Sequence, residues 1–132
     1  MAKVLIAEHD EGVLNALATL LRSAGHEVFE ADRCEDALET VASQSPDILL
    51  TDVNMPGMTG VQMIKRLRRS HPAIGIIAMS GGGMHQNPEL ATTLASIAGA
   101  DRALEKPLKN EILLSSVHSL LATARRPRAG RR

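Results

Sequence analysis

The chain of 132 residues has the length of one compact domain, and its composition, 44% apolar and 23% charged, excludes a disordered protein. One cysteine, Cys34, excludes a disulfide framework, and one aromatic residue, Phe29, excludes an aromatic platform for single-stranded nucleic acid. The net charge of zero is unevenly distributed, because five arginines lie in the last eight positions and the preceding part holds ten basic against 15 acidic residues. We predict an acidic folded domain over 1–123 and a basic, disordered tail over 124–132.

Five short apolar runs alternate with amphipathic segments. The runs lack polar alternation, which is typical of parallel strands buried on both faces, and they cover 4–7, 28–31, 47–52, 74–79 and 102–104. Apolar residues at helical spacing predict helices over 13–24, 33–43, 60–71, 88–99 and 109–122. Strict alternation with right-handed crossovers predicts an α/β fold, a doubly wound five-stranded parallel sheet with helices on both faces.

Local signals mark the ends of several helices. Gly25 is expected to close the first helix, and Asp32 with Glu35 resembles a capping box that opens the second. Thr59 and Gln62 form the same signal before the third. The fourth helix is expected to begin at 87–88, where a proline occupies the first helical position.

Polar residues follow the predicted strands. In doubly wound folds the functional site lies beyond the carboxyl ends of the strands. We therefore expect carboxylates, a hydroxyl and a lysine to converge in one crevice, and the residues at these ends are Glu8, His9, Asp10, Asp52, Ser80 and Lys106.

Four stretches carry a resemblance to a known family. They read VLIAEHDE at 4–11, LLTDVNMPGMTG at 49–60, AMS at 78–80 and GADRALEKP at 99–107. Over about residues 3–122 they resemble the receiver domain of bacterial two-component response regulators, in particular the chemotaxis-type single-domain regulators. The resemblance implies a flavodoxin-like sheet with strand order 2-1-3-4-5.

The resemblance also implies a function in phosphorelay signal transduction. Asp52 would accept a phosphoryl group from a phosphohistidine on a sensor histidine kinase or a histidine phosphotransfer protein, since a carboxylate is a competent nucleophile toward phosphorus. Lys106 would neutralise the charge of the transferred group, and Ser80 would bind a phosphoryl oxygen and move inward on activation. The Lys106–Pro107 peptide is expected to be cis. The protein would be a signalling phosphoacceptor with a protein partner as its output, and not an enzyme.

The expected metal site departs from the family pattern. Two adjacent acids are usual at the end of the first strand, and here the positions read Glu8 and His9. The expected ligands are Glu8, His9, Asp52 and the main-chain carbonyl of Asn54, with Asp10 added if the strand end shifts by one residue. Imidazole stands where Mg²⁺ prefers carboxylate, so we predict weak Mg²⁺ binding, with Mn²⁺ as the alternative.

A second departure concerns signal output. Ala103 occupies the position where the family usually carries Tyr or Phe, so a rotation coupled to Ser80 cannot operate in the usual form. Output would then pass through the glycine-rich loop 81–87, expected to be mobile, and the helix that follows it, or through another surface. Both departures support an alternative function as a phosphorylation-independent receiver-like binding scaffold. A flavin carrier shares the architecture, but the aromatic residues that usually sandwich the flavin are missing.

The remaining features predict location and surface. Neither a secretory signal nor a membrane-spanning stretch is visible, so we expect a cytoplasmic protein without a membrane partner. We expect no DNA-binding domain and a monomer or weak dimer. A solvated basic helix face is expected from Lys65, Arg66, Arg68 and Arg69, and surface positions are expected for His26, His71, His85 and His118.

Overall fold

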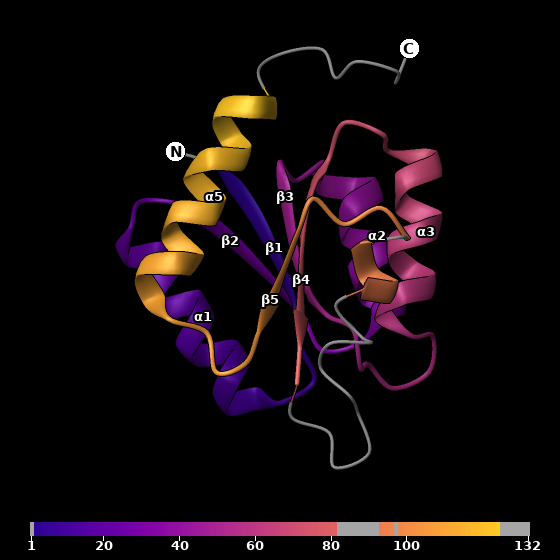
Figure 1. The fold of residues 1–132 in the computed structure, drawn as a ribbon, viewed down its shortest axis with the longest axis horizontal. Helices are drawn as coiled ribbons and strands as arrows, with labels where there is room; N and C mark the ends of the chain where they lie inside the picture. The colour runs from indigo at the N-terminus through magenta and orange to yellow at the C-terminus, as the bar shows by residue number, and fades with distance from the viewer. Residues whose placement is uncertain (1, 82–92, 97, 125–132) are drawn as a thin grey trace.

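The structure, a computed structural model, describes residues 2–81, 93–96 and 98–124 (Figure 1). These residues form a five-stranded parallel sheet with strand order β2-β1-β3-β4-β5, as predicted. The strands are β1 (Lys3–Ala7), β2 (Glu27–Ala31), β3 (Ile48–Asp52), β4 (Gly75–Ser80) and β5 (Arg102–Glu105).

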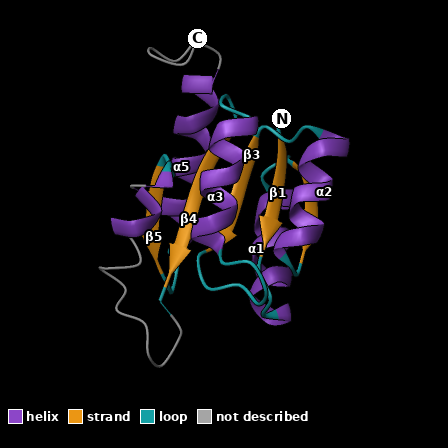
Figure 2. Cartoon of the chain, turned by 90° about the vertical axis from the view of Figure 1, so that its right-hand side faces the viewer, coloured by secondary structure: helices purple, strands orange, loops and turns teal. Residues whose placement is uncertain are grey.

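Helices cover both faces of the sheet. The labelled helices are α1 (Glu11–Ser23), α2 (Cys34–Gln44), α3 (Gly60–Ser70) and α5 (Asn110–Ala124). Figures 1 and 2 show α1 and α5 on one face and α2 and α3 on the other. Residues 93–96 are helical as well, whereas the predicted helix start at 87–88 and positions 82–87 of the predicted glycine-rich loop lie outside the described residues.

Alternate strand residues divide the core into two aliphatic clusters among the described residues. In β1, Leu5 and Ala7 belong to the cluster beneath α2 and α3, and Val4 and Ile6 to the cluster beneath α1 and α5. Every residue of β3 and β4 is buried, which is the pattern of central strands covered on both faces. No helix among the described residues is long and apolar enough to cross a membrane.

The predicted helix ends are partly right. Gly25 follows α1 with a φ of +92°, and the α3 capping box forms, with Thr59 and Gln62 each accepting a main-chain N–H from the other. The capping box at Asp32 is wrong, because α2 begins at Cys34 and the cap residue is Arg33, which makes no side-chain cap hydrogen bond. A box needs the acceptor side chain at the cap itself, and Asp32 lies one residue before it.

The predicted surface position is wrong for His26. The residue is half-buried, and its Nδ1 is buried with no hydrogen-bond partner among the described residues. Burial lowers the pKa of His26 below its ordinary value. His118 is exposed, as expected, His71 is half-buried, and His85 lies outside the described residues.

The prediction of a solvated helix face is wrong for Arg68. It is confirmed for Lys65, Arg66 and Arg69, which are exposed. The Arg68 side chain is 13% exposed and lies at the edge of the core face of α3, one residue after buried Leu67. The guanidinium donates to the carbonyls of Gly99, Pro72 and Ile74 and to the Asp101 carboxylate at 2.9 Å, and the main-chain N–H of Ile76 donates to that carboxylate. One arginine thus joins α3 to the start of β4 and to the segment that leads into β5.

Replacing Arg68 by alanine is therefore expected to destabilise the fold by about 3 kcal/mol, because it leaves several carbonyls and a partly buried carboxylate without their donor. The measurement is the urea unfolding midpoint at constant m value. Arg69→Ala is the matched control at the exposed neighbouring position and is expected to change stability by at most about 0.5 kcal/mol. Equal effects of the two substitutions would contradict the role given to Arg68.

Candidate functional site at the carboxyl ends of the strands

The predicted site residues lie at one edge of the sheet. Strand register pairs Ala7 with Thr51 and Asp52 with Met79, so β1, β3 and β4 end side by side. Figure 2 shows the arrowheads of the strands at this common edge. The described structure thereby brings Glu8, Asp52 and Lys106 together from positions far apart in the sequence.

Lys106 bridges two buried carboxylates. Its Nζ donates to Oε1 of Glu8 at 2.6 Å and to Oδ2 of Asp52 at 2.8 Å. Glu8 is fully buried and Asp52 is 3% exposed, while the lysine side chain is 18% exposed. Burial acts to lower the pKa of Lys106, but the hydrogen bonds and negative charges of Asp52 and Glu8 outweigh it and raise the pKa. The lysine is therefore a firmly protonated cation at neutral pH.

Main-chain groups orient both carboxylates. The N–H of Asn54 donates to Oδ1 of Asp52 at 2.9 Å, and the N–H of Asp10 donates to Oε2 of Glu8 at 3.1 Å. Each carboxylate thus has one oxygen on the lysine and the other on a backbone amide. The N–H of Lys106 donates to the carbonyl of Ser80 at 2.7 Å, which ties the loop after β5 to β4.

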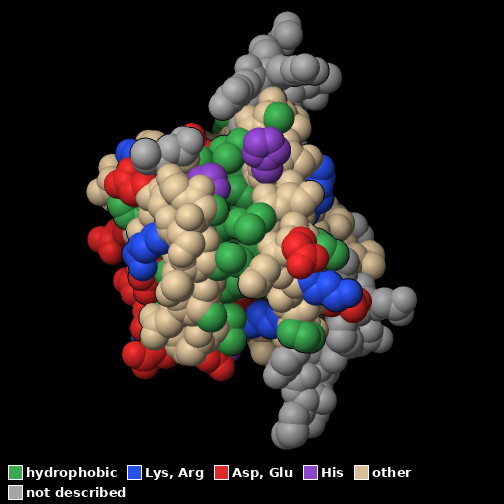
Figure 3. Space-filling model, turned by 90° about the vertical axis from the view of Figure 1, so that its left-hand side faces the viewer, with side chains coloured by type: hydrophobic (Ala, Val, Ile, Leu, Met, Phe, Trp, Pro, Cys, Tyr) green, Lys and Arg blue, Asp and Glu red, His purple; other side chains and the backbone are tan. Residues whose placement is uncertain are grey.

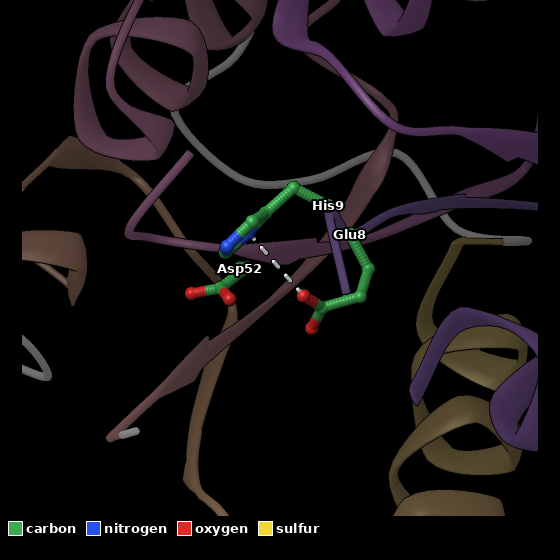
Figure 4. Close-up of side chains that lie close together, drawn as sticks. All are labelled: Glu8, His9 and Asp52. Carbon is green, nitrogen blue, oxygen red and sulfur yellow. Dashed lines mark ion pairs between the residues drawn. The ribbon is translucent and has the colours of Figure 1, made fainter. Parts of the chain in front are cut away.

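His9 completes a group of possible metal ligands. Its Nδ1 lies 3.6 Å from Oε2 of Glu8, and Figure 4 shows its ring beside both carboxylates. One ligand atom each from Glu8, His9 and Asp52 lie within 4.8 Å of one another. Three of the predicted ligands therefore come together at the ends of β1 and β3.

The other predicted site residues occupy different places. Asp10 is the N-cap of α1, where its Oδ1 accepts the N–H of Val13, so its carboxylate is committed to the helix end. Asn54 contacts Asp52 through its amide, and the role of its carbonyl stays a prediction. Ser80 is the buried last residue of β4, and the Lys106–Pro107 peptide is cis, as expected.

Gly60 is a site residue whose role no sequence pattern indicates. A Cβ at this position would lie 2.3 Å from the main-chain oxygen of Asp52 and 2.6 Å from Cα of Val53. The N–H of Gly60 also donates to the carbonyl of Val53 at 3.0 Å. The first turn of α3 therefore rests directly on the backbone that carries Asp52. The glycine is part of the quoted 49–60 motif, but only the fold reveals the close approach.

Figure 3 shows apolar side chains exposed between helices on the face formed by α1 and α5. A pocket on this face is lined by residues of α1, by Met79 and Lys106, and by the segment that enters α5. Lys106 thus belongs both to the ionic cluster that it forms with Glu8 and Asp52 and to the wall of an apolar pocket.

Comparison with known proteins places this site in a family. The model of the response regulator receiver domain matches residues 4–118. The chain is 28% identical over 124 residues to Protein PilH of Pseudomonas aeruginosa, covering 92% of this chain and 99% of PilH. It is 34% identical over 116 residues to Response regulator protein FleR of the same species, covering 88% of this chain and 24% of FleR.

One more relative and one solved structure support the same family. Transcriptional regulatory protein AfsQ1 of Streptomyces coelicolor is 29% identical, and the match covers 96% of this chain and 54% of AfsQ1. The chain thus spans about a half of the length of AfsQ1 and about a quarter of the length of FleR. A response regulator from Chloroflexus aurantiacus superposes with a TM-score of 0.83 at 32% identity, covering 92% of this chain and 98% of that one. The chain belongs to the response regulator receiver domain family.

Proposed function

We propose that this chain is a receiver that accepts a phosphoryl group on Asp52 from the phosphohistidine of a sensor histidine kinase or a histidine phosphotransfer protein. The observation that carries the proposal is the buried Asp52 carboxylate bound at 2.8 Å by a protonated lysine at the carboxyl edge of the sheet. Residues 1–123 form the receiver and 124–132 a basic tail. The protein acts in the cytoplasm as a monomer or weak dimer, as a phosphoacceptor with a protein partner and not as an enzyme.

The chemistry of the transfer follows from these side chains. An oxygen of Asp52 attacks phosphorus, an O–P bond forms, and the P–N bond of the phosphohistidine breaks with its electron pair left on the imidazole nitrogen. The ammonium of Lys106 stabilises the negative charge on the phosphoryl oxygens. The hydroxyl of Ser80, at the end of the adjacent strand, donates to one of those oxygens once the group is attached.

The family implies a divalent cation beside Asp52. Mg²⁺ prefers an all-oxygen octahedral ligand set. Here one of the three clustered ligands is the imidazole of His9, so this donor set fits Mg²⁺ poorly. Weak binding of Mg²⁺ remains the expectation from the sequence, with Mn²⁺ as the better-suited ion.

The pocket between α1 and the segment entering α5 supports a protein donor. It is mostly apolar and shares Lys106 with the ionic cluster. Because a phosphohistidine is carried on a protein surface, its carrier needs a docking area next to Asp52. The apolar side chains visible in Figure 3 would provide that area.

The test is intact-mass measurement after incubation with acetyl phosphate and, in separate samples, Mg²⁺, Mn²⁺ or Co²⁺. Wild-type protein is expected to gain one phosphoryl group with at least one ion, and Asp52→Asn is expected to gain none. Asp32→Asn, which removes an exposed acid just after β2, is the matched control and should be labelled like wild type. Labelling of Asp52→Asn would refute the assignment of the acceptor.

A second function is favoured by Ala103 and His9. Ala103 is half-buried on β5 and packs against the core cluster beneath α3, so no aromatic ring occupies this position. A phosphorylation-independent binding scaffold with an altered metal site would retain the fold and Lys106. Wild-type protein that gains no mass with any of the three ions would support this second function over the first.

A further inference from the structure

We infer that the site formed by Glu8, His9 and Asp52 binds a first-row transition metal ion in preference to Mg²⁺, with the imidazole of His9 as a direct ligand. The inference deepens the proposed function, since it concerns the cation beside the same Asp52. It changes the class of metal that supports this receiver.

The donor set carries the inference. Figure 4 shows the ring of His9 and the carboxylates of Glu8 and Asp52 turned toward one another. Ligand atoms of all three lie within 4.8 Å of one another, a spacing at which small movements bring them onto one ion. A nitrogen and two carboxylate oxygens suit Mn²⁺, Co²⁺ or Zn²⁺, whereas Mg²⁺ gains little from imidazole.

The hydrogen bonds leave a distinct side of the cluster for an ion. Lys106 occupies Oε1 of Glu8 and Oδ2 of Asp52. Oε2 of Glu8, the oxygen not bound by the lysine, is the one that lies 3.6 Å from Nδ1 of His9. The remaining oxygen of Asp52, Oδ1, accepts the main-chain N–H of Asn54 at 2.9 Å. An ion held by His9 and these two oxygens would therefore leave both contacts of Lys106 in place.

The net charge of the cluster also favours a transition metal ion over Mg²⁺. Two carboxylates and the protonated Lys106 give the cluster a net charge of −1, and an imidazole bound to a metal ion adds none. Mg²⁺ depends on anionic oxygen and dehydrates reluctantly, so a site of low charge binds it weakly. A transition ion offsets the missing carboxylate by a bond to nitrogen. The imidazole is 49% exposed, so it can reorient toward an ion without disturbing the core.

The experiment measures metal affinity of the unphosphorylated full chain, without an affinity tag, by calorimetric titration with Mg²⁺, Mn²⁺, Co²⁺ and Zn²⁺ at one pH. The variants are His9→Ala, which removes the nitrogen, and His9→Asp, which substitutes a carboxylate. His118→Ala removes an exposed histidine on α5 and is the matched control. The ¹⁵N shifts of the imidazoles with Zn²⁺ identify the coordinating ring.

Wild type and His118→Ala are expected to bind Co²⁺ and Zn²⁺ more tightly than Mg²⁺. His9→Ala is expected to lower the Co²⁺ and Zn²⁺ affinities about tenfold or more while leaving Mg²⁺ nearly unchanged. His9→Asp is expected to strengthen Mg²⁺ binding and to lower the Co²⁺ to Mg²⁺ affinity ratio by about tenfold or more. In wild type, Zn²⁺ should shift the His9 nitrogens.

An unchanged Co²⁺ to Mg²⁺ ratio in both His9 variants, or unshifted His9 nitrogens, would overturn the inference. These readouts require no phosphoryl transfer. The inference about the metal ion and the proposal of phosphoryl acceptance can therefore be refuted independently. Labelling of Asp52 together with His9-independent metal binding would refute the inference alone. His9-dependent metal binding without labelling would refute phosphoryl acceptance alone.

Discussion

Replacing Lys106 by methionine is expected to destabilise the protein by about 3 kcal/mol, near the lower end of the range for breaking a buried ion pair because the lysine side chain is 18% exposed. Methionine is unbranched like lysine and one heavy atom shorter, so it keeps the apolar stem of the side chain but removes its charge. Glu8, fully buried, and Asp52, 3% exposed, then face each other without the cation that bridges them. Repulsion between the carboxylates adds to the cost of their desolvation. Urea unfolding at neutral pH measures the loss.

A double-mutant cycle with Asp52→Asn isolates the interaction between Lys106 and Asp52. With Asn at position 52, one of the two facing charges is gone, so the Lys106→Met substitution should be less costly than in wild type. Simple additivity of the two substitutions would contradict a direct interaction between Lys106 and Asp52.

The difference in stability between wild type and Lys106→Met depends on pH with a defined sign. The pKa of Lys106 is raised above its ordinary value of 10.5, so the folded state holds the lysine proton more tightly than the unfolded state. The stabilisation is therefore complete at neutral pH and is lost as pH rises through the folded-state pKa. The gap in stability between wild type and Lys106→Met should narrow above the ordinary lysine pKa, and a gap that widened there would reverse the assignment.

Much of the fold and the centre of the site could be predicted from the sequence because they depend on coarse patterns. Apolar runs without alternation imply central parallel strands, and parallel strands end at one edge. That geometry alone predicts that Glu8, Asp52 and Lys106 meet, although 98 positions separate Glu8 from Lys106. The order of the strands came from the family resemblance and not from the apolar pattern.

The features that escaped prediction depend on single-residue geometry. Asp10 is predicted as a metal ligand only if the strand end shifts by one residue. In the structure α1 begins at Glu11, two residues before the predicted helix start, and Asp10 is its cap. Arg68 has the helical spacing of either an edge or a surface position, and only the placement of Gly99 and Asp101 turns it inward. A carbonyl acceptor supplied by a distant segment leaves no trace in the local sequence pattern.

Replacing Gly60 by alanine is expected to destabilise the fold by about 3 kcal/mol or more, against the direction that helix propensity predicts. Alanine is favoured over glycine within helices by about 1 kcal/mol. At this position the new Cβ would lie 2.3 Å from the main-chain oxygen of Asp52, a backbone atom that no side-chain rotation can move. The backbone on which Asp52 lies must shift, so labelling by acetyl phosphate should fall together with stability.

Gly12→Ala provides the matched comparison, since Gly12 also lies in the first turn of a helix. Its added Cβ would approach Oδ1 of Asp10 at 3.4 Å, an ordinary contact, so propensity should dominate and stabilise the fold by about 0.5–1 kcal/mol. Urea unfolding and intact-mass labelling of both variants measure the contrast. Opposite signs of the two stability changes would follow from the close approach of α3 to Asp52, whereas stabilisation by both alanines would mean that α3 does not rest on the backbone of the acceptor.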